Sequence, residues 1–129
     1  MEFRLFIPGD PAPQGSKTSF GKYGMREASK RVKPWREAVT MLVRNSMRLT
    51  RFEGFGKHLT DVEMRFRLNR VLADGDLSKL IRSTEDALVD AGLMDDDRYI
   101  VNLTAEKRRA GDTPVGAEPG VDIRVRRAS

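Results

Sequence analysis

The stretch HLTDVEMRFRL, residues 58–68, is the part of the chain that decides the fold. Apolar side chains take every second position, and charged side chains take the positions between them. The first set is Thr60, Val62, Met64, Phe66 and Leu68, and the second is Asp61, Glu63, Arg65 and Arg67. Because successive side chains of a strand point to opposite faces, this pattern predicts a β-strand with one buried face and one solvated face.

An amphipathic helix is expected shortly after this strand. Apolar residues recur at helical spacing from Leu77 to Ala91, and Gly92 follows them. Asp76 stands at the N-cap position, and glycine just past the last turn is a common C-terminal cap. We therefore predict a helix over residues 77–91.

Three more strands and one more helix complete the expected fold. Residues 1–7, 99–106 and 121–126 alternate, and residues 107–109 read as a turn or exposed loop. Pro34 suits a first helical position, so a helix is expected over residues 34–49. Trp35 is expected to be a core or helix-packing residue. The order predicts a single α/β (α+β) domain, residues 1–129, with a mixed β-sheet covered by two main helices.

The composition narrows the classes of partner. The chain of 129 residues has 24 Lys and Arg against 19 Asp and Glu, a net charge of +5, and no cysteine. Disulfides, zinc thiolates and a cysteine nucleophile are excluded. The positive field favours a polyanion, nucleic acid first and an anionic membrane surface second. No apolar run suits a membrane span and the N-terminus lacks the apolar core of a signal peptide, so a cytoplasmic location is expected.

Residues 10–32 are predicted to form a flexible basic loop. The segment is rich in Pro, Gly and Ser, and its basic residues alternate with Phe20 and Tyr23. Such a loop is either solvated and mobile or grips a phosphate backbone, and both hold if it orders on binding. The candidate DNA-binding residues are Lys17, Lys22, Arg26, Lys30, Arg31 and Lys33.

An acidic island interrupts this basic chain. Residues 74–97 contain eight acids and two bases, a local charge of −6. Carboxylates that converge can hold Mg²⁺, which polarises a phosphoryl oxygen and supplies a hydroxide nucleophile. Asp76 and residues 95–97 would meet if the chain turns back after Gly92 and the strand over 99–106 runs beside the strand over 58–68. The alternative is that Asp76 only caps its helix and residues 95–97 only form a polar turn.

The central block is similar to a known family. The run DLSKLIRSTEDAL (76–88), then Ala91-Gly92 and Asp96-Asp97, resembles the RusA family of Holliday junction resolvases, common in phages and prophages. The resemblance implies a RusA-like, homodimeric, Mg²⁺-dependent endodeoxyribonuclease of DNA recombination and repair that cuts four-way junctions symmetrically, with Mn²⁺ as a substitute metal. A dimer also suits the chemistry, since two strands are cut and one chain has one acidic island.

The resemblance assigns roles to named residues. It implies catalytic roles for Asp76 and Asp97, with Lys79 or Arg82 as the cation. The implied metal ligands are Asp74, Asp76, Asp96 and Asp97. Ser78 stands where the family has its second aspartate, and a two-residue shift would let Asp74 and Asp76 form the pair instead. A non-catalytic, structure-selective DNA-binding dimer and a nuclease for other branched DNA remain as alternatives.

Overall fold

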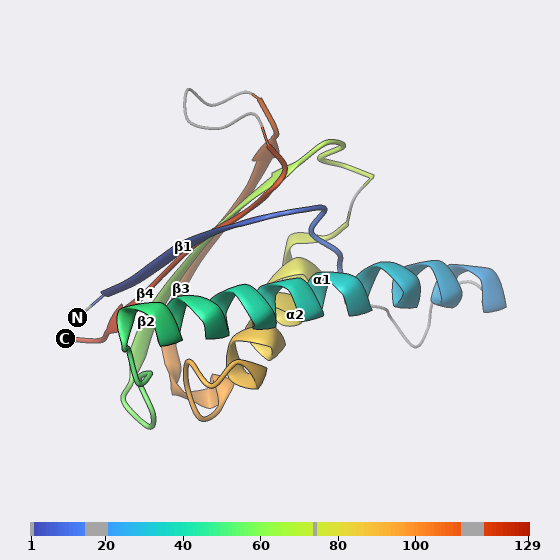
Figure 1. Ribbon diagram of the computed structural model, residues 1–129. Coiled ribbons are helices and arrows are strands. Elements are labelled where there is room, and N and C mark those ends of the chain that lie inside the picture. Colours follow the sequence, from blue (N-terminus) through green and yellow to red (C-terminus); the bar gives the residue numbers. More distant parts are fainter. Residues whose placement is uncertain (1, 15–20, 74, 112–117) are drawn as a thin grey trace.

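The structure is a computed structural model that describes residues 2–14, 21–73, 75–111 and 118–129, with the backbone alone for residues 21–29. The strand predicted over residues 58–68 is β2 (Thr60–Leu68). It occupies an inner position in a four-stranded sheet of order β1-β4-β2-β3 (Figure 1). β1 (Glu2–Pro8) and β2 both pair antiparallel with β4 (Gly120–Arg127). β3 (Ile100–Arg109) pairs parallel with β2, so the predicted mixed sheet is confirmed.

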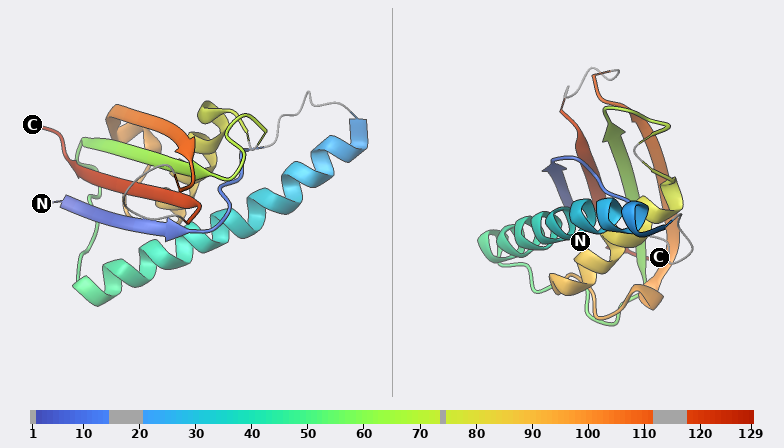
Figure 2. Two further views of the ribbon diagram at one scale, coloured as in Figure 1. Left: turned by 90° about the horizontal axis from the view of Figure 1, so that it is seen from above. Right: turned by 90° about the vertical axis from the view of Figure 1, so that its right-hand side faces the viewer.

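Two helices cover one face of this sheet. α1 (Gly21–Thr50) and α2 (Leu77–Asp90) lie on the same side, packed against each other and against the strands (Figure 2). A single mixed α and β domain with two helices was predicted, and the structure confirms it. Within the part of the chain that is described, no helix is both long and apolar enough to cross a membrane.

The apolar face of β2 is the centre of the core. Val62, Met64, Phe66 and Leu68 are each at most 1% exposed. Trp35, predicted as a core residue, is buried on α1, and its indole N–H donates to the Thr84 hydroxyl at 3.3 Å. Because a buried indole N–H needs a hydrogen-bond acceptor, this contact fixes α1 against α2.

The opposite face of the sheet is charged. Ion pairs cross it from strand to strand, including Arg67–Asp122, Arg124–Glu2, Arg124–Glu63 (3.7 Å), Arg126–Asp61 (3.5 Å) and Arg65–Glu106 (3.8 Å). The solvated face predicted from the alternation in β2 is therefore confirmed. These arginines lie beside carboxylates, which reduces their attraction for a polyanion.

The predicted basic loop differs from the structure in two places. Residues 21–32 belong to α1, which begins 13 residues earlier than predicted and contains Pro34 in its interior. Ala12 is fully buried, and its carbonyl accepts from the Ser83 hydroxyl at 2.7 Å. Pro34 was wrongly taken as a helix start. Its fixed φ and missing N–H favour the first helical position, but a helix that packs well also tolerates these two properties in its interior. The remaining residues of the loop, 15–20, lie outside the described residues.

The C-terminal half matches the prediction closely at α2 and less so at β3. α2 ends at Asp90, and Gly92, with φ of +84°, takes the left-handed position that glycine adopts readily. Gly92 N–H donates to the Val89 carbonyl and Leu93 N–H to the Leu88 carbonyl, which is the Schellman pattern. Residues 107–109, predicted as a turn, continue β3, because each pairs with a residue at the end of β2.

Pro34→Ala distinguishes a helix that continues through residue 34 from one that starts there. An interior proline lacks the N–H that would bond one turn back, so alanine should raise the free energy of unfolding by about 1 to 3 kcal/mol. Urea unfolding followed by circular dichroism measures this change. At a first helical position proline is favourable, and an unchanged or lower stability would contradict the long helix.

Candidate functional site

α2 separates the predicted acidic residues into two groups. Asp76 is the N-cap residue of α2, where its side chain makes no capping hydrogen bond and lies 3.8 Å from the Lys79 ammonium. Asp97 lies near Glu85 and Asp86, in the second half of the helix. Glu85 is nine positions after Asp76, which is about 14 Å along the helix axis at 1.5 Å per residue.

The sheet topology explains why the two groups are apart. The chain does turn back after Gly92, and β3 does run beside β2, as expected. However, β3 is parallel to β2, with Ile100 beside Thr60 and Arg109 beside Leu68. Residues 95–97 therefore precede the start of β3, whereas Asp76 follows the end of β2. The predicted meeting of Asp76 with Asp97 is not seen within one chain, and Asp74 lies outside the described residues.

The loop before α2 is fixed by neighbouring segments. Gly75 has φ of +123°, and a Cβ there would lie 2.7 Å from Pro13 Cγ. The Lys107 ammonium donates to the Val71 carbonyl at 3.0 Å and to the Gly75 carbonyl at 3.2 Å. Lys107 was not singled out from the sequence, since only the register of β3 on β2 places it here. Asp76 is thus held in position by its backbone, while its carboxylate stays exposed.

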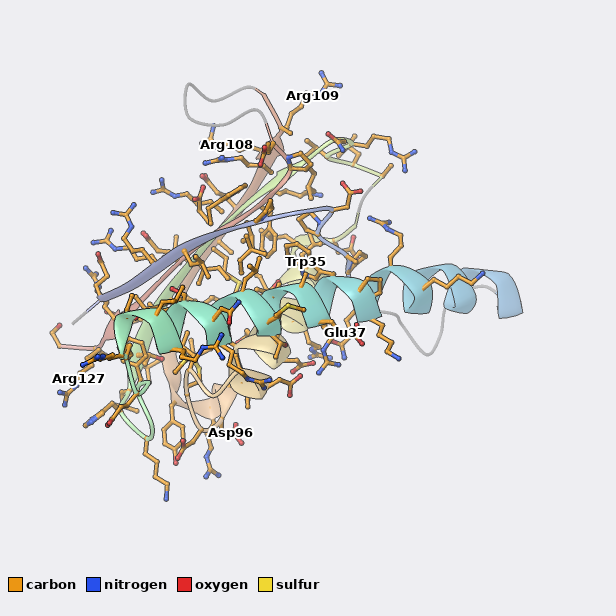
Figure 3. All side chains as sticks on the ribbon, in the orientation of Figure 1. Trp35, Glu37, Asp96, Arg108, Arg109 and Arg127 are labelled. Carbon is orange, nitrogen blue, oxygen red and sulfur yellow. The ribbon has the colours of Figure 1, made fainter. Side chains whose placement is uncertain are left out.

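Four carboxyl groups form what we call the acidic cluster, composed of Glu85, Asp86, Asp96 and Asp97. The first two come from α2, and the last two come from the turn that leads into β3 through a short 3₁₀ helix, η1 (Asp97–Tyr99). Asp96 caps this short helix, because its carboxylate accepts from the Arg98 N–H at 3.0 Å. Asp96 is labelled in Figure 3, at the end of the sheet where β3 begins.

The carboxyl groups of the cluster perturb one another. Burial, and then the charges of Asp97 and Asp86, raise the pKa of Glu85 from 4.5 to about 7. A hydrogen bond to the Asp96 side chain raises the pKa of Asp97, assisted by burial and the nearby negative charges. The Arg98 backbone N–H lowers the pKa of Asp96. Asp97 is therefore the member of this pair that retains a proton to higher pH.

The two candidate cations, Lys79 and Arg82, lie beside different acidic groups. Lys79 is paired with Asp76 at the start of α2. Arg82 is exposed, and its charge opposes the rise in pKa at both Glu85 and Asp97. Of the two candidates, Arg82 is thus the cation that acts on the acidic cluster, and the charge of Arg98 also acts on Asp96. Glu85 was not among the residues singled out from the sequence, and the structure adds it to the acidic group. Its position three residues after Arg82 on a helix was the available signal.

The predicted DNA-binding residues are only partly described. Lys30 and Lys33 are exposed on α1, and the Lys33 ammonium lies 4.0 Å from the Glu37 carboxylate. Arg31 is exposed, and its guanidinium donates to the Pro11 carbonyl at 3.3 Å. Lys22 and Arg26 belong to α1, and Lys17 lies outside the described residues.

Neither a family model nor a curated protein matches the sequence.

The raised pKa of Glu85 makes stability depend on pH. The unfolded chain ionises this carboxyl near 4.5 and the folded chain near 7, so the folded state binds the proton more tightly between these values. The stability that the folded state gains from this bound proton is fully present below pH 4.5 and is lost as the pH rises to 7. Glu85→Gln should therefore gain stability relative to wild type between pH 4.5 and 8, by about 1 kcal/mol after allowance for solvent screening at a half-exposed group.

Thermal or urea unfolding of both proteins at pH 4.5, 6 and 8 measures this difference. Glu53→Gln, an exposed carboxyl on the loop after α1, is the matched control and should show no such trend. A stability difference between wild type and Glu85→Gln that stays constant with pH would contradict the raised pKa.

Proposed function

We propose that this protein is a Mg²⁺-dependent endodeoxyribonuclease that acts as a homodimer on branched DNA, with the four-way junction as its substrate. The observation that supports it best is the acidic cluster next to Arg82, in a chain whose net charge is +5. Carboxylates suited to a hard cation and a basic exterior suited to phosphates are the two features that such an enzyme needs. The resemblance of residues 76–97 to the RusA family selects the junction as the substrate.

The chemistry of the acidic cluster fits a divalent cation. Carboxylate oxygens are the ligands that Mg²⁺ prefers, and mutual repulsion between these groups is what a cation would relieve. Asp96 and Asp97 would hold the ion on the turn before β3. The resemblance also names Asp74 and Asp76, of which Asp76 lies at the other end of α2 and would not reach the same ion within one chain. When bound, Mg²⁺ polarises a phosphoryl oxygen and lowers the pKa of its water.

The chain's own residues have separate parts in this proposal. The carboxylate of Glu85, with a pKa of about 7, is about half ionised at neutral pH and suits proton acceptance from an attacking water. The guanidinium of Arg82 would stabilise the negative charge that develops on the phosphate. Lys30 and Lys33, exposed on α1, would contact the DNA backbone.

Cleavage of a synthetic four-way junction tests this function. Wild-type protein with Mg²⁺ should cut two opposing strands symmetrically, and chelation of the metal should stop the reaction. Asp97→Asn should reduce the cleavage rate by about 100-fold or more while junction binding is retained, because it removes a charge from the ligand set. The neighbouring Asp95→Asn is the matched control and should cut normally. Full cleavage by Asp97→Asn would refute the site.

Asp76→Asn tests whether the group at the start of α2 takes part. The resemblance predicts loss of cleavage with binding retained. Normal cleavage by this variant, together with loss in Asp97→Asn, would confine the active site to the acidic cluster.

The second candidate function is a non-catalytic DNA-binding dimer that recognises branched structure. It is favoured by Ser78, which is exposed in the first turn of α2 and stands where the family has an aspartate. Among the described residues, no group of three or more His, Cys, Asp or Glu side chains is arranged to hold a metal ion. This function predicts salt-sensitive junction binding and no cleavage with any divalent metal.

Replacing Lys30 and Lys33 with alanine tests the DNA contact that both functions need. Loss of two phosphate contacts should weaken junction binding and reduce the slope of log K against log salt by about 2. Fluorescence anisotropy over a salt series measures both quantities. Lys57→Ala, an exposed lysine on the loop between α1 and β2, is the control. An unchanged slope in the double variant would exclude this part of α1 from the DNA interface.

A further inference from the structure

β3 presents a free edge. It is the terminal strand on its side of the sheet, and none of the described strands pairs with its outer edge. Its first six residues, IVNLTA (100–105), carry no charge, and Val101 and Leu103 are 48% and 42% exposed. Backbone groups along an edge of this kind are a template for another strand, and proteins usually protect such edges with charges or proline.

The two ends of β3 carry opposite charges. Asp95, Asp96 and Asp97 precede the strand, while Arg108 and Arg109 close it and are exposed, with the Arg108 guanidinium 3.2 Å from the Glu106 carboxylate of the same strand. Figure 3 shows Asp96 at one end of the molecule and the two arginines at the other. The two groups are roughly 30 Å apart at about 3.3 Å per strand residue, which is well beyond the screening length of about 8 Å in physiological salt. They do not neutralise each other within one chain.

This charge distribution selects one occupant and one orientation. A second copy of β3 laid antiparallel along the edge sets each acidic end against a basic end, at both ends of the pair. A parallel copy would set like charges together. The antiparallel arrangement is also the one that a two-fold axis produces, so the same contacts occur twice. The strand is therefore complementary to itself.

We propose that a second copy of this chain adds its β3 antiparallel to the edge of the first, and that its Arg108 and Arg109 lie beside Asp96 and Asp97. The partner's Arg109, which its pairing with Leu68 places on the helix-covered face of the sheet, then completes each acidic cluster and can contact a phosphate held there. The phosphate contact rests on the proposed function, whereas the pairing of the two β3 edges is argued from β3 alone. The uncharged residues 100–105 of the two strands lie side by side at the centre of the interface.

Sedimentation velocity and light scattering without DNA test the association. Wild type should have about twice the chain mass of 14.6 kDa. The charge reversals Arg108→Glu with Arg109→Glu, and Asp96→Arg with Asp97→Arg, should each weaken dimerisation by about tenfold or more, because each sets like charges together. Lys33→Glu with Lys57→Glu makes the same change of net charge as the arginine reversal, at positions away from β3, and should leave the dimer intact.

Mixing the two charge-reversed proteins provides the decisive step. In a mixed pair, the new arginines of one chain face the new glutamates of the other, and the unaltered ends face each other as before. The mixture should therefore recover a dimer that neither protein forms alone. Amide hydrogen exchange should also show protection of outward-facing amides of residues 100–105 that increases with protein concentration in the wild type.

The opposite results would overturn the proposal. A wild-type monomer at all concentrations would mean that the terminal charges only protect the edge. A dimer that survives both charge reversals, or one whose β3 amides gain no protection, would place the interface elsewhere. Circular dichroism of each variant shows that it is folded. The nuclease assay is independent, since a dimer without cleavage refutes the proposed function alone, and cleavage without this dimer refutes only the interface.

Discussion

The pairing of β2 on both of its edges is the constraint on which the rest of the structure depends. β2 bonds antiparallel to β4 and parallel to β3, and its apolar face is covered by both helices. Phe66 and Met64 are fully buried there. A strand with hydrogen bonds on both sides and one face removed from water has one stable register, because a shift of one residue would bury Arg65 and Arg67 instead.

The parallel bond between β2 and β3 determines where α2 goes. Two parallel strands that follow each other need a crossover connection, and α2 provides it by running back across the sheet. Apolar residues Leu80, Ala87 and Leu88 face the core, while Trp35 from α1 bonds to Thr84 between them. Since α2 returns the chain from the end of β2 to the start of β3, the residues that precede it and those that follow it lie towards opposite ends of the sheet.

This geometry changes the interpretation of the acidic island. The carboxylates fall into two sets, with Asp76 beside Lys79 at one end of α2 and the acidic cluster beside Arg82 further along it. A catalytic centre that uses both sets cannot be built from one chain as it stands. The acids at the start of β3 and the arginines at its end are likewise too far apart to interact within one chain, and a second chain can bring them together.

The sequence by itself determined most of the helices and strands. For the candidate site it determined which acidic and basic residues are available, but not which of them come together. Alternation placed β2, helical spacing and Gly92 placed α2, and Trp35 was assigned to the core, because burial and side-chain periodicity are local properties of the chain. Pro34 misled the prediction of α1, since packing outweighs one missing hydrogen bond. The direction of β3 relative to β2 and the neighbours of Asp97 depend on how distant segments pair. Only the tertiary structure decided these, because hydrogen bonds between strands and the electrostatics of neighbouring carboxylates arise from contacts that the sequence order does not contain.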